Sequence, residues 1–339
     1  AARDKTRAQP REHPDRVALD ARRDVDLAAG DGVLGVTGDR VGEGRLAGPG
    51  VPHQRQRAAG RDLDRDPAQR VAIGTCETDR GVIRYIEGPH AGEVYAHADV
   101  IFPVLHGPNG EDGTIQGMLE LFKLPYVGAG VLSSAVCMDK AMAKIVAEQA
   151  GIPQCRWVEF RDGVDDPETI TARAIDALGL PVFVKPANLG SSVGITKAHD
   201  EAELDTAVNL ALRYDNVVII EEAVTGREIE VAVLGDTAPE TSVPGEIKPG
   251  SEFYDYEDKY VTGAAQLVIP AAVSDAAAAE VRELAARTFT AMRCTGMARV
   301  DFFYEEFGRG WLLNEVNTIP GFTPGSMYPK LWEATGVPY

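Results

Sequence analysis

Residues Met297–Asn317, MARVDFFYEEFGRGWLLNEVN, contain two apolar stretches separated by the turn EEFGRG, and this pattern predicts a β-hairpin. Alternate side chains of a strand lie on the same face of a sheet. Arg299 and Asp301 should therefore share a face of the first strand, and Glu315 and Asn317 a face of the second. Charges in such apolar strands are costly to bury unless they are paired or bind a metal.

This hairpin allows two interpretations. Two carboxylates and an amide oxygen from neighbouring strands form a set of oxygen ligands suited to Mg²⁺. The alternative is a structural ion pair between Arg299 and Asp301 beside a solvated edge. Other segments of the chain favour the metal site, because they carry groups that bind phosphate.

Composition restricts the class of protein. A chain of 339 residues, 44% hydrophobic and 25% charged, is long enough for two or three domains. The formal net charge of −18 argues against a general nucleic-acid binder. No apolar run approaches the ~18 residues of a membrane span. We expect no signal peptide and a cytoplasmic location, and the 4 scattered cysteines without a C-x-x-C pair are typical of reduced thiols.

Residues 1–70 differ from the rest of the chain. They contain no Phe, Tyr, Trp, Ile, Met or Cys, and neither a strand nor a helix period persists in them. Such a segment buries too little apolar surface to offset its ordering entropy. We interpret it as a disordered arm or as an out-of-frame translation of GC-rich DNA.

The segment after residue 98 has the order strand, glycine turn and helix. A buried strand over Asp99–Leu105 leads into the turn HGPNGEDG, and helical spacing follows over Thr114–Phe122. In α/β units such a turn faces a ligand. His106 at the strand end could donate to a phosphate or carboxylate, although a lone histidine is more often structural.

Two lysines mark candidate phosphate contacts. Lys140 lies in the first turn of a predicted helix over residues 139–150, where the helix dipole disfavours a cation. Lys185 ends a predicted strand and precedes the loop PANLGSSVG. Its glycines allow backbone N–H groups to approach an anion, and Ser191 and Ser192 add hydroxyl donors. The P-loop and Rossmann patterns are both absent.

The C-terminal half completes a candidate nucleotide site. A strand over residues 217–224 ends in acids, and a second strand follows over 226–234, an arrangement suited to a purine base. The charged aromatic segment 253–260 is placed as a lid would be. The Gly/Pro-rich loop 318–327 leaves the carboxylate strand where a second substrate could bind. Lysines, a glycine loop, carboxylates and an arginine suit phosphoryl transfer.

From about residue 98 to 339 the chain resembles the D-alanine–D-alanine ligases, a family of the ATP-grasp superfamily. The matching stretches are HGPNGEDGTIQG, MDKAMAK, VKPANLGSSVG, FYDYEDKY, GMARVDFFY and NEVNTIPGFTPGSMYP. The resemblance implies an α/β fold with an N-terminal α/β domain and two α+β domains that sandwich ATP. The expected boundaries are 71–138, 139–227 and 228–339, with the anomalous segment 1–70 outside them.

The resemblance also implies an ATP-dependent ligase that forms a C–N bond for peptidoglycan synthesis. In this family ATP phosphorylates the carboxylate of one D-alanine, and the amine of a second D-alanine displaces phosphate from the acyl phosphate. The implied partners are these small molecules and a second copy of the chain in a homodimer, with no nucleic acid and no membrane.

Site residues follow from the matching motifs. The implied ATP-binding residues are Lys140, Lys185, Ser192, Glu221, Val224, Glu228 and Lys259. The implied ligands of two Mg²⁺ or Mn²⁺ ions are Asp301, Glu315 and Asn317. The residues implied in catalysis and in ordering the first D-alanine are Arg299, Ser191, Tyr260 and His106. The residues implied to line the second D-alanine subsite are Ser326 and Met327.

The chain departs from the family pattern at both ends. Residues 1–70 contain no counterpart of the GG-x-S-x-E motif that contacts the first D-alanine, and the chain stops at Tyr339 where relatives continue into a closing helix. Three readings therefore remain: the peptide ligase, another ATP-grasp ligase such as a D-alanine–D-lactate enzyme, and an ATP-binding remnant. Tyr260 matches the form that accepts an amine.

Overall fold

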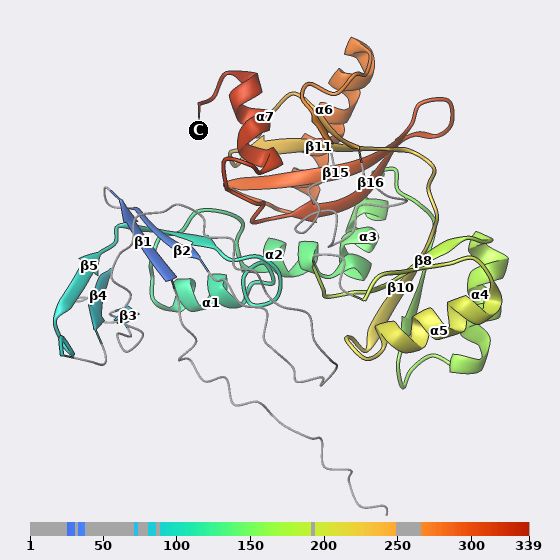
Figure 1. The fold of residues 1–339 in the computed structure, drawn as a ribbon, viewed down its shortest axis with the longest axis horizontal. Helices are drawn as coiled ribbons and strands as arrows, with labels where there is room; N and C mark the ends of the chain where they lie inside the picture. The colour runs from blue at the N-terminus through green and yellow to red at the C-terminus, as the bar shows by residue number, and fades with distance from the viewer. Residues whose placement is uncertain are drawn as a thin grey trace, which may run out of the picture.

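The computed structural model describes residues 81–85, 89–190, 194–248 and 266–338, together with strands β1 (Asp26–Gly30), β2 (Val33–Thr37) and β3 (Val71–Ile73). The predicted lid 253–260 lies outside these residues. Figure 1 shows the N-terminal strands, a central sheet with its helices, and a C-terminal sheet as three neighbouring groups.

The other elements fall in the same three groups. The remaining strands are β4 (Val82–Tyr85), β5 (Val94–His97), β6 (Val100–Val104), β7 (Trp157–Arg161), β8 (Val182–Pro186), β9 (Thr196–Ala198), β10 (Val217–Glu222), β11 (Arg227–Leu234), β12 (Glu240–Thr241), β13 (Gly245–Lys248), β14 (Gln266–Val268), β15 (Met297–Glu305) and β16 (Gly310–Asn317). The helices are α1 (Thr114–Leu121), α2 (Val131–Met138), α3 (Lys140–Gln149), α4 (Pro167–Leu178), α5 (Glu201–Ala211), α6 (Asp275–Ala291) and α7 (Met327–Thr335).

The N-terminal group contains two small sheets. In one, β2 pairs in parallel with β6 and antiparallel with β1; in the other, β3, β4 and β5 are antiparallel. Strands β1 and β2 lie inside residues 1–70, where we expected disorder. They form because β6 supplies a backbone partner, which local composition does not reveal. For the remainder of that segment, disorder stays a prediction.

The central sheet has the order β7-β10-β8-β9 and is antiparallel throughout. Helices α4 and α5 cover one face and bury apolar side chains such as Phe160, Leu204 and Ile220. Helix α5 begins as predicted, because the Asp200 carboxylate caps it by accepting from the Glu203 N–H at 2.9 Å. The helix-free face carries the charged residues described below.

The C-terminal sheet positions the predicted hairpin. Its order is β14-β13-β11-β15-β16, and the hairpin β15–β16 is confirmed with a turn between Glu305 and Gly310. Val231 and Val300 on one face pack with α6, whereas the opposite face packs with α7 through residues such as Ala232. Side-chain alternation therefore places the charged residues Glu230, Arg299 and Asp301 on the α7 face and leaves the α6 face apolar.

Two helices were not predicted. α2 lacks a side-chain cap at Gly130 and a clear apolar stripe, and α7 begins at Met327, the last residue of the expected loop. Pro329 lies in the first turn of α7, where its missing N–H costs no helical hydrogen bond. α3, which we expected within the central domain, packs on α6 through residues such as Ala147.

The N-terminal group meets the C-terminal sheet at two glycines. Gly296, directly before β15, has φ +69°, and a Cβ built there would lie 2.9 Å from the Gly128 N. The Thr295 hydroxyl donates to the Gly128 carbonyl at 3.4 Å. Only glycine permits both this backbone conformation and this approach.

Gly296→Ala should lower the free energy of unfolding by about 1–3 kcal/mol, because it adds left-handed strain and a clash with Gly128. Thermal unfolding measures the change. Gly117→Ala in α1 is the matched control, since its Cβ would meet nothing within 4 Å and should stabilise the helix by up to about 1 kcal/mol. Equal effects of the two substitutions would contradict the close approach.

Candidate functional site

Arg299 and Asp301 share a face of β15, as predicted. The Arg299 Nε and a terminal guanidinium nitrogen donate to the two Asp301 oxygens at 2.8 and 2.7 Å. This bidentate geometry is the strong form of a charged hydrogen bond. Both oxygens of one predicted metal ligand are thus engaged by the predicted catalytic arginine.

Glu315 and Asn317 lie opposite this pair on β16. Asp301 faces Glu315 across the strands and Arg299 faces Asn317, and the Asn317 side-chain amide donates to Asp301 Oδ2 at 2.9 Å. The three predicted metal ligands are therefore brought together. Two carboxylates and an amide oxygen on adjacent strands fit the hard oxygen donors that Mg²⁺ or Mn²⁺ requires. Within the described ranges, the hairpin included, no three His, Cys, Asp or Glu side chains are grouped so as to hold a metal ion, so a site here depends on the Asn317 amide oxygen as well.

Glu230 on β11 is a site residue that the sequence analysis missed. It lies opposite Asp301 in the sheet, is 4% exposed, and approaches the Arg299 Nε to 3.0 Å. Burial would lower the pKa of Arg299, but Asp301 and Glu230 outweigh it and hold the pKa well above its ordinary value. The arginine is thus fixed in its charged form between two acids.

Glu221, predicted to face adenine, is paired with two lysines. Its Oε1 lies 2.7 Å from the Lys144 Nζ and its Oε2 lies 2.5 Å from the Lys185 Nζ. Burial acts to raise the pKa of Glu221, but the two ammonium groups lower it to about 2. Lys185 was predicted as a phosphate contact; Lys144 on α3 was not predicted.

Lys140 and the glycine loop lie together. The Lys140 N–H donates to the Ala187 carbonyl at 3.0 Å, and its Nζ donates to the Leu189 carbonyl. Burial lowers the pKa of Lys140, although Glu315 partly offsets this effect. An incoming phosphate would stabilise the charge on this ammonium. Gly190 approaches Gly107, so the central loop touches the N-terminal glycine turn.

His106 connects the N-terminal turn to the loop after β16. Its Nδ1 lies 2.8 Å from the Ile319 carbonyl oxygen. The neighbouring Glu111 accepts from the Gly107 N–H at 2.7 Å and from the Ile319 N–H at 3.1 Å. Glu111, also missed from sequence, therefore fixes the predicted substrate loop against the predicted first-substrate turn.

The remaining predicted contacts are more widely distributed. Val224 lies half-buried in the connector after β10, and Glu228 lies half-buried on β11. The Ser326 hydroxyl accepts from the Thr323 N–H at 3.1 Å, and the Met327 side chain is buried in the cluster under α7. Any contact from Met327 to a substrate would therefore come from its backbone. Ser191, Ser192, Lys259 and Tyr260 lie outside the described residues.

Glu315 influences the charge state of three predicted site residues. Its carboxylate acts on Lys140, Lys185 and Arg299, in each case favouring the protonated form. For Lys185, burial would lower the pKa, but Glu221 and Glu315 raise it. The charges of two lysines and of the hairpin arginine thus act together with one carboxylate, a combination of charges that can bind a metal–phosphate complex.

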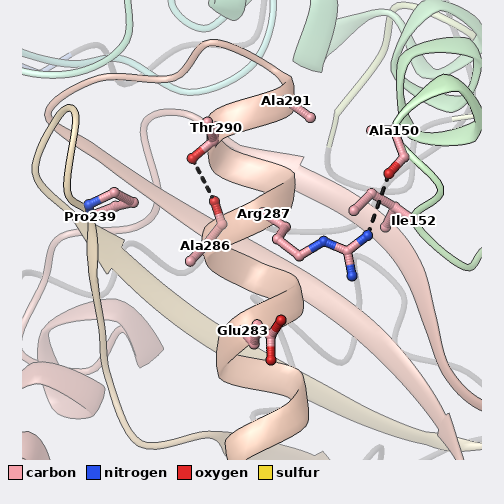
Figure 2. Close-up of a pocket in the computed structure, with 8 residues that line it drawn as sticks. All are labelled: Ala150, Ile152, Pro239, Glu283, Ala286, Arg287, Thr290 and Ala291. Carbon is pink, nitrogen blue, oxygen red and sulfur yellow. Dashed lines mark hydrogen bonds between the residues drawn. The ribbon is translucent and has the colours of Figure 1, made fainter.

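A surface pocket of about 420 Å³ lies elsewhere, between α6 and the end of α3 (Figure 2). Arg287 of α6 reaches across it and donates to the Ala150 carbonyl at 3.4 Å. No predicted site residue lines this pocket, so it is separate from the candidate site described above.

No disulfide joins the cysteines of the described residues. Cys137, Cys155 and Cys294 are free and buried, as expected for reduced thiols. The Cys137 and Cys294 sulfurs nevertheless lie 3.7 Å apart, a proximity that their sequence separation conceals. Within the described part of the chain, no helix is long and apolar enough to cross a membrane.

Known proteins resemble the chain over most of its length. The family profiles described as "D-ala D-ala ligase C-terminus" and "D-ala D-ala ligase N-terminus" match residues 146–339 and 50–129. The D-alanine--D-alanine ligase of Thermoanaerobacter sp. (strain X514) is 52% identical over 269 residues, covering 79% of this chain and 74% of the relative. The N-terminal profile begins inside the segment 1–70 that we treated as anomalous.

Solved structures give the same likeness. The D-alanine-D-alanine ligase from Coxiella burnetii has a TM-score of 0.66 at 39% identity, covering 79% of this chain and 70% of its own. The VanG D-Ala:D-Ser ligase from Enterococcus faecalis has a TM-score of 0.68 at 39% identity, covering 78% of this chain and 75% of its own.

Glu221→Gln should destabilise the chain in a pH-dependent way, because its folded pKa of about 2 lies below the ordinary 4.5. The difference in free energy of unfolding between wild type and variant should be full above pH 4.5 and shrink as pH falls towards 2. Urea unfolding at several pH values measures it. The exposed Glu283→Gln is the control, and a pH-independent Glu221 difference would contradict the pairing.

Proposed function

The chain belongs to the D-alanine–D-alanine ligase family, and we propose that it ligates two D-alanines at the expense of ATP for peptidoglycan synthesis. The observation that carries the proposal is that Arg299, Asp301, Glu315 and Asn317 face one another across the hairpin, and that Glu315 acts electrostatically on Lys185. These are the groups that an acyl-phosphate reaction needs. The family is ATP-dependent, which supports ATP as the phosphoryl donor.

The proposed ATP contacts divide between the phosphates and the nucleoside. Lys140 and Lys185 hold the ATP phosphates, together with Lys259 and Ser192, which lie outside the described residues. Val224 contributes backbone groups and Glu221 a carboxylate to the adenine site, and Glu228 accepts from the ribose.

Arg299 acts on the reacting carboxylate. The carboxylate oxygen of the first D-alanine attacks the γ-phosphorus, and ADP leaves. The amine of the second D-alanine then attacks the acyl carbon, the tetrahedral intermediate collapses, and phosphate departs with that oxygen. A guanidinium fixed by Asp301 and Glu230 stabilises the negative charge of the intermediate without reorganising.

Two Mg²⁺ or Mn²⁺ ions complete the proposed site. Asp301, Glu315 and Asn317 would hold them, and the ions would neutralise charge on the β- and γ-phosphates. Because Asp301 is paired with Arg299, metal binding requires this carboxylate to share its oxygens between the two cations.

The proposed substrate contacts form two groups, one for each D-alanine. We assign Ser191, Tyr260 and His106 to the first D-alanine, and Ser326 with the Met327 backbone to the second. The likeness to a D-Ala:D-Ser ligase makes D-serine a second candidate acceptor beside D-lactate. We further propose a cytoplasmic homodimer; exposed apolar side chains of α1, α2 and α3, including Leu121, Leu132 and Met142, support a covered face.

Phosphate release from ATP and Mg²⁺ should depend on D-alanine and exceed release with D-serine, D-lactate or no acceptor. The measurement is a coupled phosphate assay with chromatographic identification of the dipeptide. If more phosphate is released with D-lactate or D-serine than with D-alanine, the acceptor is a different one. ATP binding without any acceptor-dependent release would identify a remnant.

Arg299→Ala should lower kcat by about 10²–10³-fold while changing the dissociation constant of ATP far less, because its charge serves the intermediate. Steady-state kinetics and calorimetric ATP binding give the two quantities. The exposed Arg213→Ala should change neither. Equal losses in kcat and ATP affinity for Arg299→Ala would mean that the arginine is structural.

A further inference from the structure

Lys144 is a buried cation outside the proposed set of phosphate contacts. It lies on α3 and is 4% exposed, and its ammonium contacts Glu221 Oε1 at 2.7 Å and the Cys155 sulfur at 3.4 Å. Its backbone is fixed as well, because the Gln154 side chain donates to the Lys144 carbonyl at 2.9 Å. Helix α3 therefore holds this lysine against Glu221 of strand β10.

Lys185 and Lys144 approach Glu221 differently. Lys185 on β8 pairs with Ile219 of β10, and Glu221 lies two residues after Ile219. The side chains of Lys185 and Glu221 therefore lie on the same face of the sheet. The side chain of Lys185 is 13% exposed and interacts with Glu315, whereas that of Lys144 is 5% exposed. The ammonium of Lys185 can thus move from Glu221 to a phosphate, whereas that of Lys144 remains paired with Glu221.

The charge balance explains why a second lysine is needed. If Lys185 turns to a phosphate, a buried Glu221 without another cation would pay the full cost of desolvation. It would then bind a proton and become a donor as well as an acceptor. Lys144 prevents this change, because it keeps one carboxylate oxygen paired while the other becomes available.

We propose that Lys144 is a positioning residue that holds Glu221 as a charged acceptor for the 6-amino group of the purine, and thereby selects adenine over 6-oxo purines. The inference rests on the proposed function, in which Glu221 faces the base. A 6-amino group donates to a carboxylate, whereas a 6-oxo group presents a second acceptor and is repelled. Without Lys144, a protonated Glu221 can donate to the 6-oxo group.

The test compares ATP with inosine triphosphate in Lys144→Met, which keeps length and apolar bulk but removes charge. Calorimetric binding with Mg²⁺ and no D-alanine gives both affinities without turnover. ATP affinity should fall roughly 10- to 100-fold, the loss expected for one charge-assisted hydrogen bond. Inosine triphosphate affinity should fall less or rise, so the ATP preference shrinks at least tenfold.

Kinetics and two further variants separate a positioning role from general loss of structure. With D-alanine, Lys144→Met should raise the KM for ATP much more than it lowers kcat, and Lys144→Arg should restore the wild-type preference. If Lys144→Met does not fold, Lys144→Gln carries the same prediction, since its amide can donate to Glu221 without bringing charge.

Equal losses for the two nucleotides, a loss confined to kcat, or a wild type that binds them equally would overturn the inference. Its failure is distinguishable from failure of the proposed function. A wild type that prefers ATP in binding, yet releases no phosphate with D-alanine, would refute the ligase while leaving the role of Lys144 standing.

Discussion

Burying charge away from water is the constraint on which this site depends. An uncompensated buried carboxylate or ammonium costs several kcal/mol, and the structure meets that cost with shared pairs. Arg299 lies between Asp301 and Glu230, and Glu221 lies between Lys144 and Lys185. Arg299 with Glu230 and Glu221 with Lys185 join neighbouring strands, and Glu221 with Lys144 joins a strand to a helix. The contacts that hold these elements together therefore also hold the reactive groups.

The pairs also determine how a ligand can bind. In the proposed site, a metal would share Asp301 with Arg299, and a phosphate would draw Lys185 from Glu221. In both cases a second buried partner remains, Glu230 for the arginine and Lys144 for the carboxylate. Binding then exchanges one charged contact for another and does not expose an unpaired charge, which keeps the cost of rearrangement low.

Much of this arrangement could be predicted from the sequence, and the missing part has a physical reason. The β15–β16 hairpin, the shared face of Arg299 and Asp301, and the position of Lys185 follow from side-chain alternation, a local property. Glu230 and Lys144 act through partners far away in the sequence, which no local pattern reveals. One signal was available, however: Lys144 follows Lys140 by one helical turn, a like-charge spacing that is unfavourable unless an anion lies near.

The central claim is that a D-alanine carboxylate is activated as an acyl phosphate beside Arg299. The most direct measurement is transfer of oxygen-18 from the carboxylate of labelled D-alanine during ligation. Each phosphate released should carry one labelled oxygen, because the carbon–oxygen bond breaks when the amine displaces phosphate. Release of phosphate without the label, alongside dipeptide formation, would contradict the account.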